Sequence, residues 1–343
     1  MRYMKKVAAI LVLGALVLGV VGCSNSGENK TKSSNSKIAY VITGTLGDEG
    51  FFDSGYEGLC RAKDEFNVQE VKSIESFDPV DWEPNLRNAA QAGYDLIFAG
   101  GTPMKDYVEK LAPQFPNLHF VLFDGKITGI ENVISVEYGE EQGAYVAGVL
   151  AALMTTETDI EGINPEKKVG FIGGMDIAVG QNWLNGFKQG VKAIDPEIEV
   201  LSAFAGTFGD PGKGKELALA QYEQGADVIL HAAGDTGLGV LEAAKVAGRY
   251  AIGSDADQDN LQPGHVLTSI MKRVDNSLFN AAEMHYSDKW EGGQSFMYNI
   301  ENDGVVLTDM SVIGDKVPAE IKAKVQSAID DIKSGKIKVE RIR

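Results

Sequence analysis

A carboxylate and an aromatic ring stand three residues apart in a glycine-rich stretch near the start of the chain. Asp48 and Phe51 lie in the sequence GTLGDEGF, residues 44–51. A carboxylate can accept hydrogen bonds from a polar edge, and an aromatic ring can cover a flat molecular face. No nucleophile or general base stands beside this pair, so it indicates molecular recognition.

Other residues that could contact a ligand also follow stretches predicted to be strands. They are Phe208, Gly234, Asp255 and Asp257. Taken singly, each aspartate could equally be a helix N-cap or a loop carboxylate, and Phe51 could be a core residue. Together, two rings and several carboxylates suit a flat molecule that bears hydroxyl groups. Each stacked ring is worth about 1–3 kcal/mol, and each hydrogen bond to a carboxylate about 1.5–3 kcal/mol.

The elements that would position these side chains are strands and helices in alternation. Residues 38–42 are apolar on both faces, as in a buried parallel strand, and a helix is predicted to begin near Phe51. Further strand–helix pairs continue to residue 136, and a second series runs over residues 169–252. The pattern predicts an α/β fold with two doubly wound parallel-sheet lobes joined by a hinge. Ligands of such sheets bind at the carboxyl ends of the strands.

Residues after 266 depart from this alternation, as expected for segments that recross a hinge. The N-terminal lobe is therefore predicted to comprise residues 37–136 and 270–300. The C-terminal lobe is predicted to comprise residues 137–269 and 301–343.

The first 36 residues indicate export and anchoring. A basic start and an apolar core of about 15 residues predict a signal peptide over residues 1–22. The sequence VVGC, residues 20–23, resembles the bacterial lipobox, in which the cysteine is lipidated. Residues 23–36 then form a polar tether, and an ordinary signal peptide with a coincidental cysteine is the alternative. With Cys23 acylated, Cys60 has no disulfide partner and is predicted to be a buried apolar residue.

Charge and motifs argue against several classes of function. The net charge of −17 becomes about −20 without the three cations of the signal peptide, which argues against nucleic-acid binding. The stretch at residues 209–215 fits the start of a P-loop, but Glu216 stands where a Ser or Thr is needed, so a turn before a helix is the preferred interpretation. Four scattered histidines form no metal-ligand pattern. We therefore expect no cofactor, no metal site and no enzymatic activity.

Five stretches, in this order and spacing, resemble the BMP (basic membrane protein) family, the nucleoside-receptor branch of bacterial substrate-binding lipoproteins. They are GDEGFFDSGYEG (47–58), PNLRNAAQAGYDLIFAGG (84–101), EEQGAYVAGVLAALM (140–154), DPGKGKELALAQYEQGADVILHAAGDTG (210–237) and, in residues 250–275, YAIGSDADQDNL followed by VLTSIMKRVD. The resemblance covers essentially the whole mature chain and implies the type I periplasmic-binding-protein-like fold.

The resemblance also implies a purine nucleoside ligand (guanosine, adenosine or inosine) whose base lies between Phe51 and Phe208. It implies that Asp48 binds the base edge and that Asp255 binds the ribose hydroxyls, with Gly234 and Lys272 nearby. The candidate contacts also include Phe52, Gly101 and Asp257. This chain departs from the family pattern D-x-S-F-N, because Gly50 and Phe52 replace its serine and asparagine.

The sequence therefore predicts a lipid-anchored receptor on the extracytoplasmic face of the cell membrane that delivers a nucleoside to an ABC permease. A paired Phe-Phe is also similar to ribose-type sugar receptors, so a pentose or other small solute is the first alternative. A nucleoside-cleaving lipoprotein enzyme and a ligand-sensing lipoprotein are the others.

Overall fold

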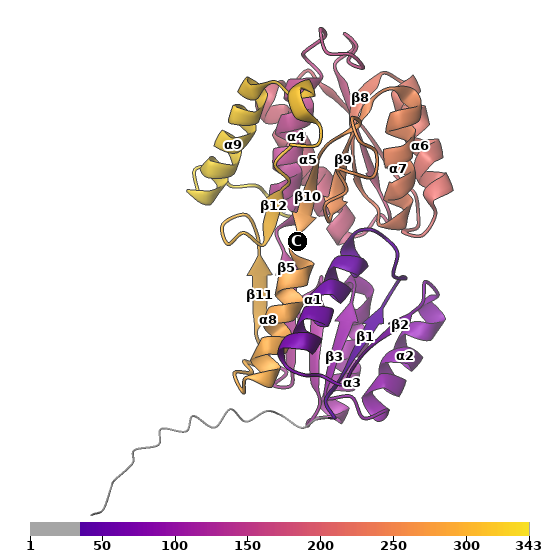
Figure 1. The fold of residues 1–343 in the computed structure, drawn as a ribbon, viewed down its shortest axis with the longest axis vertical. Coiled ribbons are helices and arrows are strands. Elements are labelled where there is room, and N and C mark those ends of the chain that lie inside the picture. The colour runs from indigo at the N-terminus through magenta and orange to yellow at the C-terminus, as the bar shows by residue number, and fades with distance from the viewer. Residues whose placement is uncertain (1–34, 343) are drawn as a thin grey trace, which may run out of the picture. The chain divides into compact units, whose positions relative to one another are not determined.

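A computed structural model describes residues 35–342, whose strands and helices are shown in Figure 1. The predicted signal peptide, Cys23 and all but the end of the predicted tether lie outside the described residues. The described residues form two sheets, each of six strands.

The first sheet has the strand order β11-β5-β4-β3-β1-β2, and all of its strands are parallel. Its strands are β1 (Lys37–Ile42), β2 (Glu70–Glu75), β3 (Leu96–Gly100), β4 (His119–Phe123), β5 (Val133–Tyr138) and β11 (Ser295–Tyr298).

The second sheet has the order β12-β10-β9-β8-β6-β7, in which β12 alone is antiparallel to its neighbour. Its strands are β6 (Lys168–Gly173), β7 (Glu199–Phe204), β8 (Ala226–Ala232), β9 (Tyr250–Asp255), β10 (Val266–Lys272) and β12 (Val305–Leu307). The predicted α/β class with two parallel-sheet lobes is confirmed.

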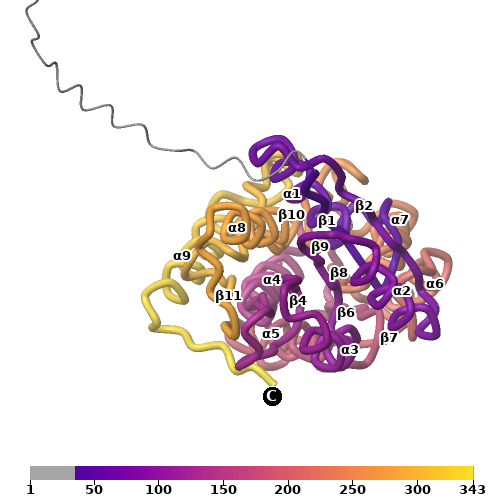
Figure 2. Tube along the Cα trace, turned by 90° about the horizontal axis from the view of Figure 1, so that it is seen from below, coloured from indigo at the N-terminus to yellow at the C-terminus, as the bar shows by residue number. Residues whose placement is uncertain are grey.

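Helices cover both faces of each sheet because the central strands are apolar on both faces. The α-helices are α1 (Phe51–Glu65), α2 (Pro79–Gln91), α3 (Lys105–Leu111), α4 (Glu140–Met154), α5 (Ala178–Ile194), α6 (Pro211–Glu223), α7 (Asp235–Ala247), α8 (Val274–Tyr286) and α9 (Ala319–Lys333). In β1, Ile38, Tyr40 and Ile42 pack with the α1 and α8 side chains, whereas Ala39 and Val41 pack with those of α2 and α3. Figure 2 shows α1 and α8 side by side on one face of this sheet and α2 and α3 on the other.

The second sheet is covered in the same way. Its largest core cluster joins α4, α5 and α9, and a smaller one joins α6 and α7. We call the first sheet with α1–α3 and α8 the first lobe, and the second sheet with α4–α7 and α9 the second lobe.

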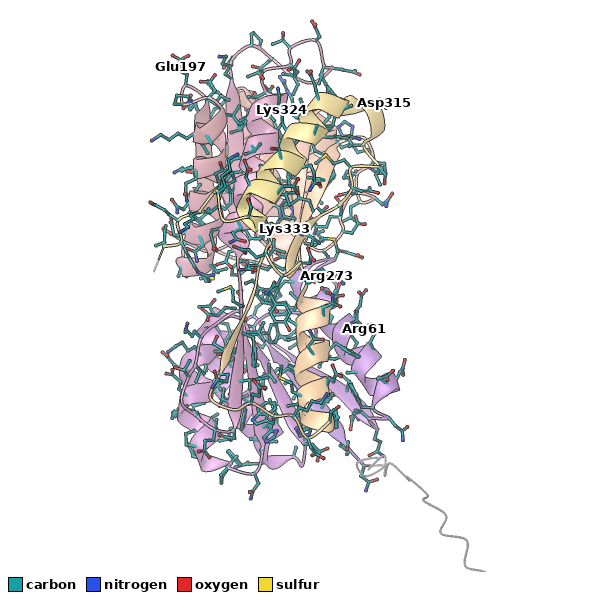
Figure 3. The ribbon with its side chains drawn as sticks, turned by 90° about the vertical axis from the view of Figure 1, so that its left-hand side faces the viewer. Arg61, Glu197, Arg273, Asp315, Lys324 and Lys333 are labelled. Carbon is teal, nitrogen blue, oxygen red and sulfur yellow. The ribbon has the colours of Figure 1, made fainter. Side chains whose placement is uncertain are left out.

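The chain passes between the lobes at three places, which are β5 to α4, β10 to α8, and β11 to β12. Backbone hydrogen bonds tie these passages together: Gly139 N donates to Tyr298 O at 2.8 Å, and Arg273 N donates to Gly304 O at 2.9 Å. Figure 3 shows Arg273 at the start of α8, where the lobes adjoin. The C-terminal residues return to the same junction, where Arg341 Nη1 donates to Tyr138 O at 2.7 Å (Figure 1).

The local structure agrees with one prediction from the sequence and contradicts another. The α6 helix begins at Pro211 with Asp210 as its N-cap, which accepts a hydrogen bond from Lys213 N at 2.9 Å, so the turn-before-helix interpretation of residues 209–215 is confirmed. The α2 helix begins at Pro79, where Asp78 is the N-cap and accepts a hydrogen bond from Val80 N. The prediction that Cys60 is buried was wrong, because its position on α1 leaves it partly exposed.

Candidate functional site: a cavity between the two lobes

A cavity of about 330 Å³ lies where the strand ends of the two lobes face each other. This volume falls at the lower end of the range typical of small-molecule sites, about 300–1,000 Å³. Eight of the nine predicted contact residues line it: Asp48, Phe51, Phe52, Gly101, Phe208, Gly234, Asp255 and Lys272. The ninth, Asp257, does not; it is exposed, and its Oδ1 accepts a hydrogen bond from Asp259 N at 3.1 Å.

The two predicted stacking rings come from different lobes. Phe51 begins α1, and its ring meets that of Phe123 at a centroid distance of 5.5 Å. Phe208 follows β7 in the second lobe and packs on Gly174, where a Cβ would lie 2.2 Å from the ring. Within residues 35–342, no contact is found between the Phe51 and Phe208 rings. Phe51 and Phe208 thus contribute one ring from each lobe to the lining of the same cavity.

The glycines in the lining allow a close approach of backbone to ligand. Gly101 has a φ of +98°, and a Cβ there would lie 2.5 Å from Thr43 Oγ1. Gly234 has a φ of +54° and precedes α7 beside Phe208. A side chain at either position would be strained by its backbone conformation.

Asp48 is turned toward the backbone of its own loop. Its Oδ1 accepts from Gly50 N and Asp53 N, both at 3.0 Å, and its Oδ2 accepts from Phe52 N at 2.9 Å. Burial raises the pKa of Asp48 to about 7, against the opposing effect of these three N–H donors. A carboxylate has about four acceptor sites, so one remains for a ligand.

Lys272 is the central charge of the cavity and is only 3% exposed. Its Nζ donates to Asp124 Oδ1 at 3.1 Å and lies 3.8 Å from Asp255 Oδ1. Burial would lower the pKa of Lys272, but Asp124, Asp255 and Glu140 outweigh it and raise that pKa to about 12. The ammonium also lies 5.0 Å from the Phe51 ring centroid, within cation–π range.

The two carboxylates paired with Lys272 occupy unusual backbone conformations. Asp124 directly follows β4 and Asp255 is the last residue of β9, with φ values of +65° and +70°. Left-handed conformations of non-glycine residues are uncommon and cluster at functional sites, and aspartate is among the side chains that tolerate them. Each strand thus ends in a turn that directs a carboxylate toward the same ammonium.

A second buried carboxylate near Lys272, that of Glu140, forms an ion pair with Arg341 near the C-terminus. Glu140, at the start of α4, is 1% exposed, and its Oε1 accepts from Asn182 Nδ2 at 2.9 Å and from Arg341 Nη2 at 3.3 Å. Burial raises the pKa of Glu140 to about 7, although Lys272 and Arg341 oppose that rise. Glu140 therefore interacts both with Lys272 in the cavity wall and with Arg341 at the lobe junction.

Sequence comparison with known proteins shows the family of this chain. The family model described as "ABC transporter substrate-binding protein PnrA-like", named Bmp, matches residues 35–340. The chain belongs to the Bmp family. It is 32% identical to the "ABC transporter nucleoside-binding protein BmpA" of Lactococcus lactis subsp. cremoris, over 98% of this chain and 99% of that one. It is also 32% identical to the "CD4+ T-cell-stimulating antigen" of Listeria innocua, over 96% of each chain.

A solved structure supports the Bmp assignment at the level of fold. The solute-binding protein of an ABC transporter system from Aeropyrum pernix K1 aligns with a TM-score of 0.80 at 26% identity, covering 90% of this chain and 94% of that one. Membership in the Bmp family makes this chain an ABC transporter substrate-binding protein, which implies a small solute as ligand and a permease as partner. No helix within residues 35–342 is long and apolar enough to cross a membrane.

Several residues that line the cavity of this Bmp protein were not predicted from the sequence, and two of them, Asp124 and Trp183, lie close to Lys272. Asp124 directly follows the buried strand β4, so its position carried a usable signal. Trp183 lies on α5, 2% exposed, with its ring 5.9 Å from Lys272 Nζ, and nothing in its surrounding sequence marks it as a cavity residue. Within residues 35–342, no group of three or more acidic, histidine or cysteine side chains could hold a metal ion.

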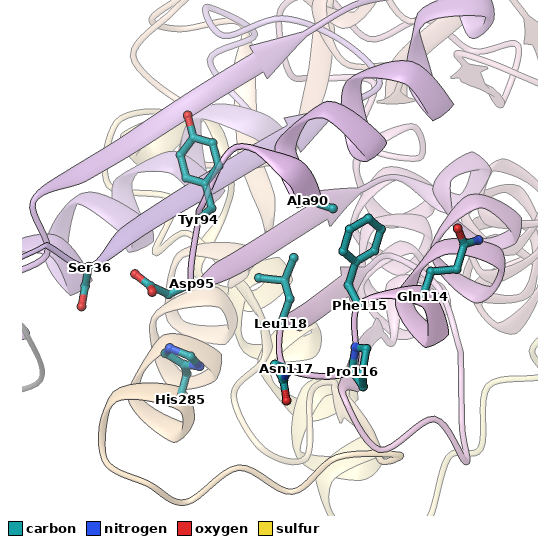
Figure 4. Close-up of a pocket in the computed structure, with 10 residues that line it drawn as sticks. All are labelled: Ser36, Ala90, Tyr94, Asp95, Gln114, Phe115, Pro116, Asn117, Leu118 and His285. Atoms are coloured by element: carbon teal, nitrogen blue, oxygen red, sulfur yellow. The ribbon is translucent and has the colours of Figure 1, made fainter.

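A larger hollow, of about 560 Å³, opens at the far end of the first lobe (Figure 4). Its lining includes Ser36, Asp95 and Leu118, which directly precede β1, β3 and β4. It therefore lies at the amino ends of the strands, opposite the edge where parallel sheets bind ligands. Asp95 Oδ2 already accepts from Lys37 N at 2.6 Å. The cavity between the lobes is therefore the candidate ligand site.

Proposed function

We propose that this Bmp-family protein binds a purine nucleoside between its lobes and delivers it to an ABC permease. The observation that carries the proposal is the composition of one small cavity, which has an aromatic ring from each lobe and a buried carboxylate held by Lys272. The printed name of the Lactococcus relative, a nucleoside-binding protein, supports the same ligand class.

The chemistry of a nucleoside matches the two kinds of group in the cavity. Phe51 and Phe208 offer flat apolar faces to a base, and Asp255 offers acceptors to vicinal hydroxyls. Carboxylates from both lobes, Asp124 and Asp255, would repel a phosphate brought near them. A neutral nucleoside is therefore favoured over a nucleotide. Isothermal titration calorimetry with guanosine, adenosine and inosine tests the proposal directly, and binding of a pentose with none of the three would favour the sugar alternative.

The stacking role of the rings predicts a loss of affinity on truncation. Phe51→Ala and Phe208→Ala should each weaken nucleoside binding about 5- to 150-fold, because one stacked ring is worth about 1–3 kcal/mol. Titration calorimetry measures the change. Phe115→Ala, which removes a ring from the hollow at the far end of the first lobe, should leave the affinity unchanged. Wild-type affinity in either cavity variant would make that ring a packing residue only.

We further propose that Cys23 is lipidated and holds the protein at the extracytoplasmic face of the membrane. The proposal rests on residues 20–23 and the polar stretch after them. Radiolabelled palmitate should enter the wild-type chain and the Cys60→Ala variant, and should be lost from Cys23→Ala. A wild-type chain that takes up no label would exclude the anchor.

A further inference from the structure

Gln258 bridges the two lobes beside the cavity, in addition to the Lys272–Asp124 pair inside it. Gln258 lies in the loop after β9, is 1% exposed, and donates from Nε2 to Glu49 O at 3.0 Å. Glu49 belongs to the other lobe, in the loop that carries Asp48 and leads into Phe51. The bond therefore joins the two loops that form opposite walls of the cavity.

The orientation of Gln258 is determined within its own lobe. Its Oε1 accepts from Ser254 N at 3.0 Å, which requires that end of the amide to be the oxygen. Its backbone N donates to Ser269 Oγ at 3.0 Å, which holds the loop against β10. The Nε2 donor must then point across the cleft.

His231 supports this orientation from β8. Its Nε2 lies 2.9 Å from Gln258 Oε1, so Nε2 carries the proton and Nδ1 is an acceptor. Burial lowers the pKa of His231 to about 4, which keeps the ring neutral. A Cβ on Gly237 would lie 2.1 Å from Nδ1, so the ring is packed on backbone and cannot swing away.

The same network reaches the cavity carboxylate. Ser254 Oγ lies 3.3 Å from His231 Nδ1 and 3.1 Å from Asp255 Oδ2. The single hydroxyl proton can serve either acceptor. A continuous chain of polar contacts therefore runs from Asp255 through Ser254, His231 and Gln258 to the backbone of Glu49.

We propose that Gln258, oriented by His231, is a positioning residue that stabilises the closed arrangement, by which we mean the one described here with Gln258 bonded to Glu49, and that it couples closure to Asp255, the carboxylate proposed to bind the ligand. The coupling of closure to ligand binding rests on the proposed nucleoside function, whereas the stabilisation of the closed arrangement does not. One neutral hydrogen bond should change the ratio of closed to open molecules by a factor of about 2 to 12.

Hydrogen–deuterium exchange of the ligand-free full chain tests the hold on the closed arrangement. Gln258→Met keeps the side-chain length but removes the donor, so peptides covering residues 44–56 of the first lobe should exchange faster. Gln262→Met, a half-buried glutamine of the same segment, is the control and should leave those peptides unchanged. If Gln258→Met folds poorly, Gln258→Glu keeps the Oε1 acceptor and replaces only the Nε2 donor, and should give the same result.

Calorimetry with inosine tests the link to the ligand. Gln258→Met should bind inosine about 2- to 12-fold more weakly than wild type. In the exchange experiment, the Gln258→Met variant could exchange like wild type in residues 44–56 and faster only in the second lobe. That result would show that Gln258 acts within its own lobe and would overturn the proposal. If wild-type protein does not bind guanosine, adenosine or inosine, the nucleoside function fails, while the exchange result still decides the role of Gln258.

Discussion

Guanosine, adenosine or inosine should bind about 10⁴- to 10⁵-fold more tightly than its 2′,3′-dideoxy analogue. Asp255 is 8% exposed in the cavity, and burial raises its pKa while Lys272 opposes that rise. A ligand without hydroxyl donors would leave this buried carboxylate with Ser254 and Lys272 alone, and the acceptor sites meant for the ligand would stay unsatisfied, which is costly. The free base should bind poorly for the same reason. Titration calorimetry with the ribonucleoside, the dideoxynucleoside and the base measures the ratio.

Variants of two neighbouring aspartates assign the effect to one carboxylate. Asp255→Asn should remove most of the discrimination, because an amide offers only one comparable acceptor. Asp257→Asn is the matched control and should behave as wild type, since Asp257 is exposed and outside the cavity. Equal affinity of wild-type protein for base and nucleoside would contradict the role assigned to Asp255.

Lys272→Met should lower the free energy of unfolding at pH 8 by about 3–5 kcal/mol, the cost of breaking a buried ion pair on one side. The substitution leaves Asp124, Asp255 and Glu140 without their shared cation. Burial already raises the pKa values of Asp255 and Glu140, and without Lys272 both rise further above those of the unfolded chain, so the native state binds more protons as the pH falls. The loss in the free energy of unfolding caused by Lys272→Met should therefore become smaller below pH 7. Urea unfolding at pH 8 and pH 5 measures it.

Lys215→Met is the matched control for lost lysine packing and charge. Lys215 pairs with Glu242 at 2.6 Å, but both side chains are about one-third or more exposed. Exposed pairs contribute about 0–1 kcal/mol, so this variant should stay within that range. A Lys272→Met loss no larger than that of Lys215→Met would show that the three carboxylates do not depend on Lys272.

The elements of this fold could largely be predicted because buried parallel strands are continuous apolar runs bounded by glycine-rich turns. The strand ends then indicated the cavity, since Asp48, Phe208 and Asp255 each follow such a run and line the same space. Parallel strands bring distant loops to one edge of a sheet, so their positions can be inferred without their contacts.

The partners of the charged side chains could not be predicted in this way. Lys272 pairs with Asp124 across 148 positions, and Arg341 reaches Glu140 across 201. These pairs depend on how the two lobes meet at the junction, which no local pattern records. Asp48 shows the same difficulty at short range. Its place in the cavity was predictable, but the three backbone amides that orient it were not.

Native mass spectrometry of the purified protein, mixed with equal concentrations of nucleosides, free purine bases and pentoses, tests the nucleoside assignment most directly. The composition of the cavity predicts one bound molecule whose mass is that of guanosine, adenosine or inosine, recovered intact after hours of incubation. A bound pentose, or no bound nucleoside, would contradict the assignment. Free base and ribose released from the nucleoside during incubation would identify a hydrolase in place of a receptor.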